Sequence, residues 1–130
     1  KYYGLAHCLI VPSEVDPWGL VVNEGMASGL PVIVSRGCGS ASTLVKEGRN
    51  GWTFAVNDID QLTKLITQMG CLSKDEWELM SAESLAIISD WSLDLFVQGV
   101  FAAIKIPKRP SIPFLSRVLI RLWNGRVSIN

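Results

Sequence analysis

The chain has 130 residues, enough for one domain built around a single hydrophobic core. Its twelve Lys and Arg residues balance its twelve Asp and Glu residues, and this neutrality argues against a basic protein that binds nucleic acid. The charges are unevenly placed, however. Residues 1–104 carry six basic and twelve acidic side chains, a net charge of −6, whereas residues 105–130 carry six basic side chains and no acidic one. We therefore expect the C-terminal segment to be a separate electrostatic unit.

The first predicted elements form a βαβ unit. The apolar run 8–11 is followed by Pro12, which has no amide proton to donate to a sheet, so a buried strand should end there. A helix is predicted from Leu20, and Gly29 ends it because glycine adopts the left-handed conformation found after helices. Residues 32–34 are apolar without polar alternation, which is typical of a parallel strand covered on both faces. The predicted fold class is α/β with a parallel sheet.

The loop between the first strand and the helix is the predicted binding site. In an open parallel sheet a ligand binds beyond the carboxyl ends of the strands, which places it against the loop from Ser13 to Gly19. The free amides and the dipole of the helix start favour a phosphate or a polyhydroxylated ligand. Asp16 lies just before the helix. Glu24 lies about one and a half turns further along, where its carboxylate could accept hydrogen bonds from the two hydroxyls of a ribose.

Two stretches carry a resemblance to a known family. Residues 16–24 read Asp-Pro-Trp-Gly-Leu-Val-Val-Asn-Glu, and residues 26–33 read Met-Ala-Ser-Gly-Leu-Pro-Val-Ile. Together they resemble the donor-site segment of retaining glycosyltransferases of family 4. The resemblance implies a GT-B architecture, in which two Rossmann-like domains enclose the active site. This chain would then supply part of the C-terminal, nucleotide-sugar-binding domain.

The resemblance also implies roles for individual residues. Glu24 corresponds to the second acid of the family's E-x7-E motif, which binds the ribose of the nucleotide. Asp16 falls at the first acid, which faces the donor sugar and would be the catalytic residue. The backbone amides of Trp18, Gly19 and Leu20 correspond to the segment that lies against the sugar and the diphosphate.

A second loop follows the strand at 32–34. Gly37 and Gly39 permit a tight turn there, and we expect this loop to lie beside the donor. Family members carry an acid shortly before the apolar pair that follows this loop, whereas this sequence has Ser42 or Thr43 in its place.

The expected reaction is the transfer of a hexosyl group from a nucleoside diphosphate sugar to a hydroxyl of a carbohydrate or lipid-linked acceptor. The resemblance implies no cofactor and no metal. In the family, the phosphate-binding Arg and Lys and the acceptor-binding N-terminal domain lie upstream of this region. The chain begins at Lys1 and enters a strand almost at once, so we expect a fragment of a cytoplasmic enzyme that is inactive alone.

Three alternatives compete with this interpretation. The chain could be a non-catalytic module that binds a nucleotide sugar or a partner. The motif could instead belong to a GT-B phosphorylase or epimerase. Finally, Asp16 could be a turn residue that caps the helix, and Glu24 a surface acid.

The rest of the chain continues the α/β alternation. A turn at 48–51 precedes a short predicted strand at 52–56. Asp58 can cap a helix that reaches Gly70, and Ser73 with Glu76 forms a capping box for the next helix. A third helix is predicted from about Ser92. We expect its apolar residues to belong to the core. They are Leu95, Phe96, Val100, Phe101 and Ile104.

Three segments are predicted along the chain: a partial nucleotide-sugar-binding domain at 1–104, a proline-rich linker at 105–113 and a basic amphipathic tail at 114–130. Within the tail, residues 114–123 could form a helix with Arg117 and Arg121 on one face. This helix could pack on the missing N-terminal domain, lie on an anionic membrane as a peripheral contact, or be disordered.

The three cysteines and the single histidine do not have the spacing of a zinc site. We expect Cys8, Cys38 and Cys71 to be free thiols, and His7 to be a packing residue rather than a catalytic one. Neither a signal peptide nor an apolar run of about twenty residues marks the sequence for secretion or membrane spanning.

Overall fold

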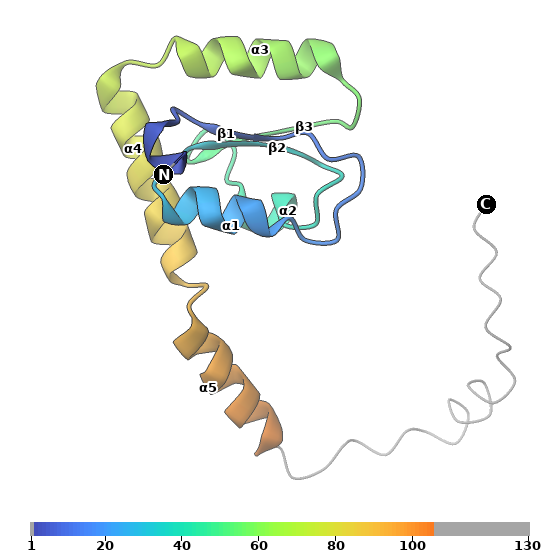
Figure 1. Cartoon of the computed structure of the whole chain (residues 1–130), viewed down its shortest axis with the longest axis vertical. Coiled ribbons are helices and arrows are strands. Elements are labelled where there is room, and N and C mark those ends of the chain that lie inside the picture. The colour runs from blue at the N-terminus through green and yellow to red at the C-terminus, as the bar shows by residue number, and fades with distance from the viewer. Residues whose placement is uncertain (1, 106–130) are drawn as a thin grey trace, which may run out of the picture. The chain divides into compact units, whose positions relative to one another are not determined.

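A computed structural model describes residues 2–105 of the chain (Figure 1). The described elements, in order, are η1 (Tyr3–Leu5), β1 (Leu9–Val11), α1 (Leu20–Ala27), β2 (Val32–Ser35), α2 (Ala41–Leu44), β3 (Gly51–Phe54), α3 (Ile59–Gly70), α4 (Lys74–Ser89) and α5 (Leu93–Ile104). The chain divides into two units, with the boundary between Phe96 and Val97. The predicted linker and tail helix lie outside the described residues, apart from Lys105.

The first unit is built on a three-stranded parallel sheet in the order β1-β2-β3. The register pairs Ile33 of the central strand with Ile10 on one side and Trp52 on the other. All four residues of β2 are buried, so the strand is covered on both faces. The prediction of a parallel α/β sheet with a fully buried strand at 32–34 is therefore confirmed.

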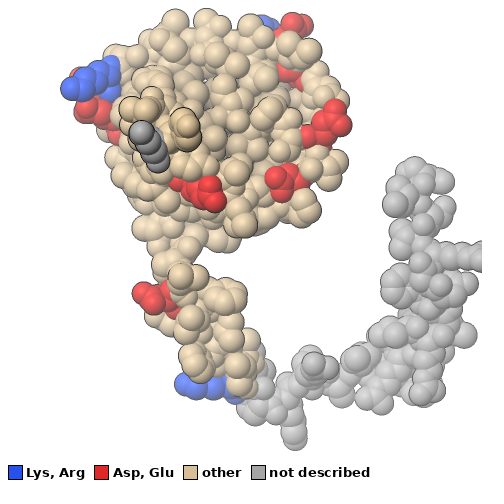
Figure 2. Space-filling view, in the orientation of Figure 1, with Lys and Arg blue, Asp and Glu red and all other residues tan. Residues whose placement is uncertain are grey.

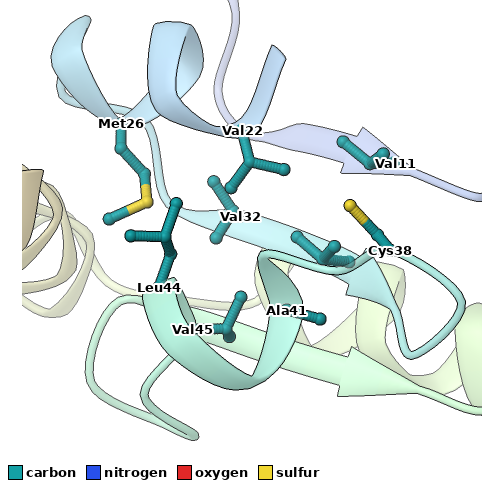
Figure 3. Close-up of a cluster of buried hydrophobic side chains, with 9 residues drawn as sticks. Val11, Val22, Met26, Val32, Cys38, Ala41, Leu44 and Val45 are labelled. Carbon is teal, nitrogen blue, oxygen red and sulfur yellow. The ribbon is translucent and has the colours of Figure 1, made fainter. Parts of the chain in front are cut away.

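Helices cover both faces of this sheet (Figure 1). On one face, Val22 and Met26 of α1 and Leu44 of α2 pack with Val32, and all four side chains are fully buried (Figure 3). On the other face, Met69 of α3 packs with Ile33 and Phe54. The alternation of Val32 and Ile33 between the two clusters follows from the two-residue period of a strand.

The two capped helices begin where their sequence signals place them. Asp58 Oδ1 accepts a hydrogen bond of 2.8 Å from the Gln61 amide at the start of α3. At the start of α4, Ser73 Oγ accepts from the Glu76 amide, and Glu76 Oε2 accepts from the Ser73 amide at 2.8 Å. The Ser73 hydroxyl and amide both hydrogen-bond this carboxylate, which lowers the pKa of Glu76.

One prediction about burial was wrong. The apolar face of α5 was expected to be core, yet no residue of α5 is buried, and Phe96 and Ile104 are 69% and 72% exposed. The apolar periodicity correctly predicted a helix, but it could not predict whether another surface covers that helix. Beyond the glycine turn, the structure also forms the one-turn helix α2, which was not predicted because it is too short for periodicity to reveal.

Residues 74–104, taken as one helical stretch, are long and apolar enough to cross a membrane by length and composition alone. No membrane span was predicted from the sequence. The structure divides the stretch into α4 and α5, with residues 90–92 outside either helix. α5 has 12 residues and is about 18 Å long, shorter than the roughly 30 Å hydrocarbon core of a bilayer.

Candidate functional site

The structure holds Asp16 at the carboxyl edge of the sheet through its backbone. The Asp16 amide donates to the Gly37 carbonyl at 3.0 Å, and the Gly39 amide donates to the Asp16 carbonyl at 2.9 Å. These two bonds form a parallel bridge between Asp16 and Cys38. The loop after β1 and the loop after β2 are thereby tied together at the predicted catalytic residue.

Gly37 and Gly39 are required here because the two loops approach closely. A Cβ atom on Gly37 would lie 2.8 Å from the carbonyl carbon of Glu14 and still closer to its oxygen. A Cβ atom on Gly39 would meet the Pro17 carbonyl in the same way. Side chains at either position would push backbone against backbone, so the close approach of the two loops requires glycine at both positions.

The amides at the start of α1 differ in availability. The Trp18 amide donates to Asp16 Oδ1 at 3.1 Å, so Asp16 forms a turn with it. Among residues 2–105, the amides of Gly19 and Leu20 donate no hydrogen bond, and no side chain caps α1. Gly19 has φ of +80°, and a Cβ there would meet Cys38 Sγ. Of the three predicted donor-binding amides, the structure leaves two free for a ligand.

The Trp18 side chain is fixed by its neighbours. Its indole N–H donates to Asn23 Oδ1 at 2.9 Å, and its ring packs against Trp91 with centroids 5.1 Å apart. The Cys38 thiol donates to the Trp18 carbonyl at 3.1 Å. An apolar hollow of about 510 Å³ lies beside this cluster and is bordered by Leu20 and Phe96. The sequence motif included Trp18 but gave no sign of Trp91, because the two residues are distant along the chain.

Glu24 lies on the exposed side of α1, about one turn into the helix. Its Oε2 atom accepts a hydrogen bond of 2.8 Å from the Tyr3 hydroxyl of η1. Among the described residues, Tyr3 is the one side chain that donates to this carboxylate. No sequence motif pointed to Tyr3, because it lies 21 positions before Glu24.

The other predicted positions flank the loop pair. Ser13 is half-buried two residues after β1, and a Cβ atom on Gly37 would lie 2.9 Å from its carbonyl oxygen. Ser42 and Thr43, which stand where an acid was expected, are both exposed on α2. Ser42 borders an open hollow of about 490 Å³ together with Arg36 and Gly39. Arg36 was not singled out in the sequence analysis, although its position directly after a buried strand was a usable signal.

Acidic side chains are scattered over the visible face of the first unit, and basic side chains lie at the margin of that face (Figure 2).

Within residues 2–105, no three His, Cys, Asp or Glu residues gather as a metal site would require. Cys8, Cys38 and Cys71 are free thiols, and burial raises the pKa of Cys8. His7 stacks on Trp77 with ring centroids 5.3 Å apart, as expected for a packing residue.

The fold has a counterpart among solved structures. It is similar to that of sucrose-phosphate synthase from Thermosynechococcus elongatus, with a TM-score of 0.64 and 24% sequence identity over 78% of this chain and 27% of that one. The α/β arrangement is thus that of a Rossmann-like domain of the GT-B fold.

The family follows from the sequence comparisons. Residues 1–79 match the model of the glycosyl transferases group 1, so the chain belongs to this family. It is 40% identical over 68 residues to a sulfoquinovosyl transferase of Arabidopsis thaliana, a match that spans 50% of this chain and 13% of that protein. It is 31% identical over 103 residues to a D-inositol 3-phosphate glycosyltransferase of Thermobifida fusca strain YX, spanning 78% of this chain and 23% of that protein.

Proposed function

We propose that the chain supplies the donor-binding part of a retaining glycosyltransferase, which moves a sugar from a nucleoside diphosphate sugar to an acceptor hydroxyl. The observation that carries this proposal is the backbone bridge from Asp16 to Gly37 and Gly39, beside the free amides of Gly19 and Leu20. The Asp16 carboxylate, the Gly37–Gly39 loop and the start of α1 therefore lie together at the carboxyl edge of the sheet. A binding site of this kind suits a ligand that carries both hydroxyls and a diphosphate.

Each group has a distinct role in the proposed reaction. Asp16 keeps Oδ2 available after Oδ1 accepts from Trp18, so it can orient and polarise the donor sugar. The amides of Gly19 and Leu20 stabilise negative charge that develops on the leaving diphosphate. Glu24 accepts hydrogen bonds from the ribose hydroxyls. We do not assign Asp16 as a covalent nucleophile, because that role belongs to a pair of carboxylates flanking the scissile bond.

We further propose that these residues act within a longer transferase. The chain spans about an eighth and about a quarter of the two curated relatives described above. Cations for the diphosphate, the acceptor site and an N-terminal domain would come from the rest of that protein. We propose a metal-free, cytoplasmic enzyme whose residues 114–123 either pack on the N-terminal domain or contact anionic lipid. Vesicle co-sedimentation at low and high salt tests this contact, and absence of binding at low salt would contradict it.

The transfer proposal is tested in the longer protein that contains these residues. Nucleoside diphosphate sugars are screened for formation of a glycosylated acceptor, and NMR of the product reports whether the anomeric configuration of the donor is retained. Asp16→Asn should lower kcat by at least about a hundredfold, because the sugar loses its charged partner in the transition state. Asp60→Asn, which changes an exposed acid in the first turn of α3, is the matched control.

The same assay separates the alternative functions. Full activity in Asp16→Asn would favour a non-catalytic module. Release of free nucleotide or sugar phosphate without a glycosylated acceptor would favour a phosphorylase or an epimerase. Inversion of the anomeric centre would contradict the retaining mechanism while leaving the transferase assignment intact.

A further inference from the structure

The contact between Tyr3 and Glu24 joins two elements that the sequence keeps apart. Tyr3 lies in η1, before the first strand, and Glu24 lies on α1 after it. The Tyr3 hydroxyl donates to Glu24 Oε2 at 2.8 Å, and the two residues are separated by 21 positions. The contact therefore depends on the tertiary fold and not on local sequence.

A glutamate on the exposed side of a helix has several free torsions, and binding a ligand must restrict them. A phenol is a suitable restraint because its ring moves as a rigid body and its O–H donates one hydrogen bond. The Tyr3 hydroxyl occupies Oε2 only. Glu24 Oε1 keeps its lone pairs for a ligand. A carboxylate held in this way presents one oxygen in a defined direction before the ligand arrives.

We propose that Tyr3 is a positioning residue for ribose recognition, which fixes Glu24 so that its second oxygen meets the two ribose hydroxyls of the donor nucleotide. This inference rests on the proposed function, since it assigns the ribose to Glu24. Its consequence is selectivity. The restraint matters for a nucleotide that carries both ribose hydroxyls, and it matters less for a 2′-deoxynucleotide, which offers Glu24 one hydroxyl fewer.

The protonation state of Tyr3 suits this role. The hydrogen bond to Glu24, desolvation and the charge of that carboxylate all raise the pKa of Tyr3 above its ordinary value of 10.0. The phenol therefore remains a donor throughout the neutral range. Glu24→Gln should move the titration of the Tyr3 phenol back toward its ordinary position, which NMR of a ring-labelled chain can follow.

The inference is tested by steady-state kinetics of the longer transferase, with Tyr3→Phe as the variant and Tyr2→Phe as the matched control. The same hydroxyl is removed in both, but Tyr2 is 88% exposed, and its contribution to η1 is a backbone carbonyl that accepts from the Leu5 amide at 3.0 Å. In Tyr3→Phe we expect the donor KM to rise about five- to tenfold, the range of one net hydrogen bond, with kcat within about twofold. Tyr2→Phe should match the wild type.

Nucleoside diphosphates and their 2′-deoxy analogues, used as competitive inhibitors, provide the selectivity readout. The uridine, adenosine and guanosine forms are compared in pairs. In the wild type the ribonucleotide should bind more tightly than its 2′-deoxy analogue, and in Tyr3→Phe this difference should shrink. A variant that only loosened the fold would weaken both forms equally and lower kcat as well.

The possible results distinguish failure of the Tyr3 inference from failure of the proposed transferase function. If the wild type transfers sugar and Tyr3→Phe has unchanged or tighter donor binding, the inference is overturned and the proposed function stands. Equal weakening of ribo- and deoxyribonucleotides would overturn it too. If the wild type neither transfers sugar nor binds any nucleoside diphosphate, the proposed function fails and the inference fails with it.

Discussion

Gly39→Ala tests the closeness of the two loops that form the site. Gly39 has no left-handed backbone conformation to lose, so the effect of a methyl group there is steric. The new Cβ would lie 2.8 Å from the Pro17 carbonyl carbon and 3.4 Å from the Trp18 Cα. Both atoms belong to the backbone and cannot rotate away, so one loop must move. The movement would break the 2.9 Å hydrogen bond from the Gly39 amide to the Asp16 carbonyl.

The expected loss of stability can be worked out from these contacts. Inserting a methyl group where no space exists costs about 1–3 kcal/mol, and one net hydrogen bond contributes about 1 kcal/mol. Gly39→Ala should therefore lower the free energy of unfolding by about 2–4 kcal/mol. It should also lower donor-dependent activity, because Asp16 moves with its carbonyl.

Urea unfolding of the 130-residue chain measures the first effect, and donor kinetics of the longer protein measure the second. Gly70→Ala is the matched control, since nothing lies within 4 Å of its Cβ position at the end of α3. It should leave stability unchanged or raise it by up to about 1 kcal/mol. If Gly39→Ala stays within about 0.5 kcal/mol of the wild type, the loops are not packed as described.

Two further predictions concern the framework of the first unit. Asn50 is fully buried, and its side chain accepts from the Lys46 amide at 2.7 Å and donates to the Leu44 carbonyl at 3.1 Å. Asn50→Ala would leave both backbone groups unpaired, so it should lower the free energy of unfolding in urea by about 2–4 kcal/mol. A loss below about 1 kcal/mol would refute this. The capping box of α4 should make stability pH-dependent. The pKa of Glu76 is lowered, so its contribution is present above its ordinary value of 4.5 and disappears as the pH falls through the lowered value. As the pH is lowered from this ordinary value, the urea midpoint should fall less steeply in Ser73→Ala than in the wild type. Identical pH profiles of the two proteins would count against a role of the capping box.

Much of the first unit could be predicted because local signals and tertiary structure agree there. The strand at 32–34 was evident from its unbroken apolar run, and the starts of α3 and α4 were evident from Asp58 and from the Ser73–Glu76 pair. Each signal acts within a few residues of the structure it predicts. The position of the loops relative to the sheet followed from the general geometry of parallel α/β units.

The contacts that complete the site could not be predicted in the same way. The glycines at 37 and 39 indicated a tight turn, but nothing in the sequence revealed that the turn would pair with the backbone of Asp16. The hydrogen bond between Tyr3 and Glu24 depends on where η1 lies after the sheet has formed. The exposure of α5 escaped prediction for a related reason, because an apolar periodicity is the same whether or not another surface covers it.

The central claim, that Glu24 belongs to a donor nucleotide site, is tested most directly by donor saturation kinetics of Glu24→Gln in the longer transferase. The matched control is Glu78→Gln, an exposed acid on α4 whose side chain lies 3.6 Å from Lys74. A carboxylate that accepts hydrogen bonds from a ribose should, when replaced by an amide, raise the donor KM by about tenfold or more, while Glu78→Gln leaves it unchanged. If Glu24→Gln has the donor KM of the wild type, Glu24 is a surface acid and this account of the site is wrong.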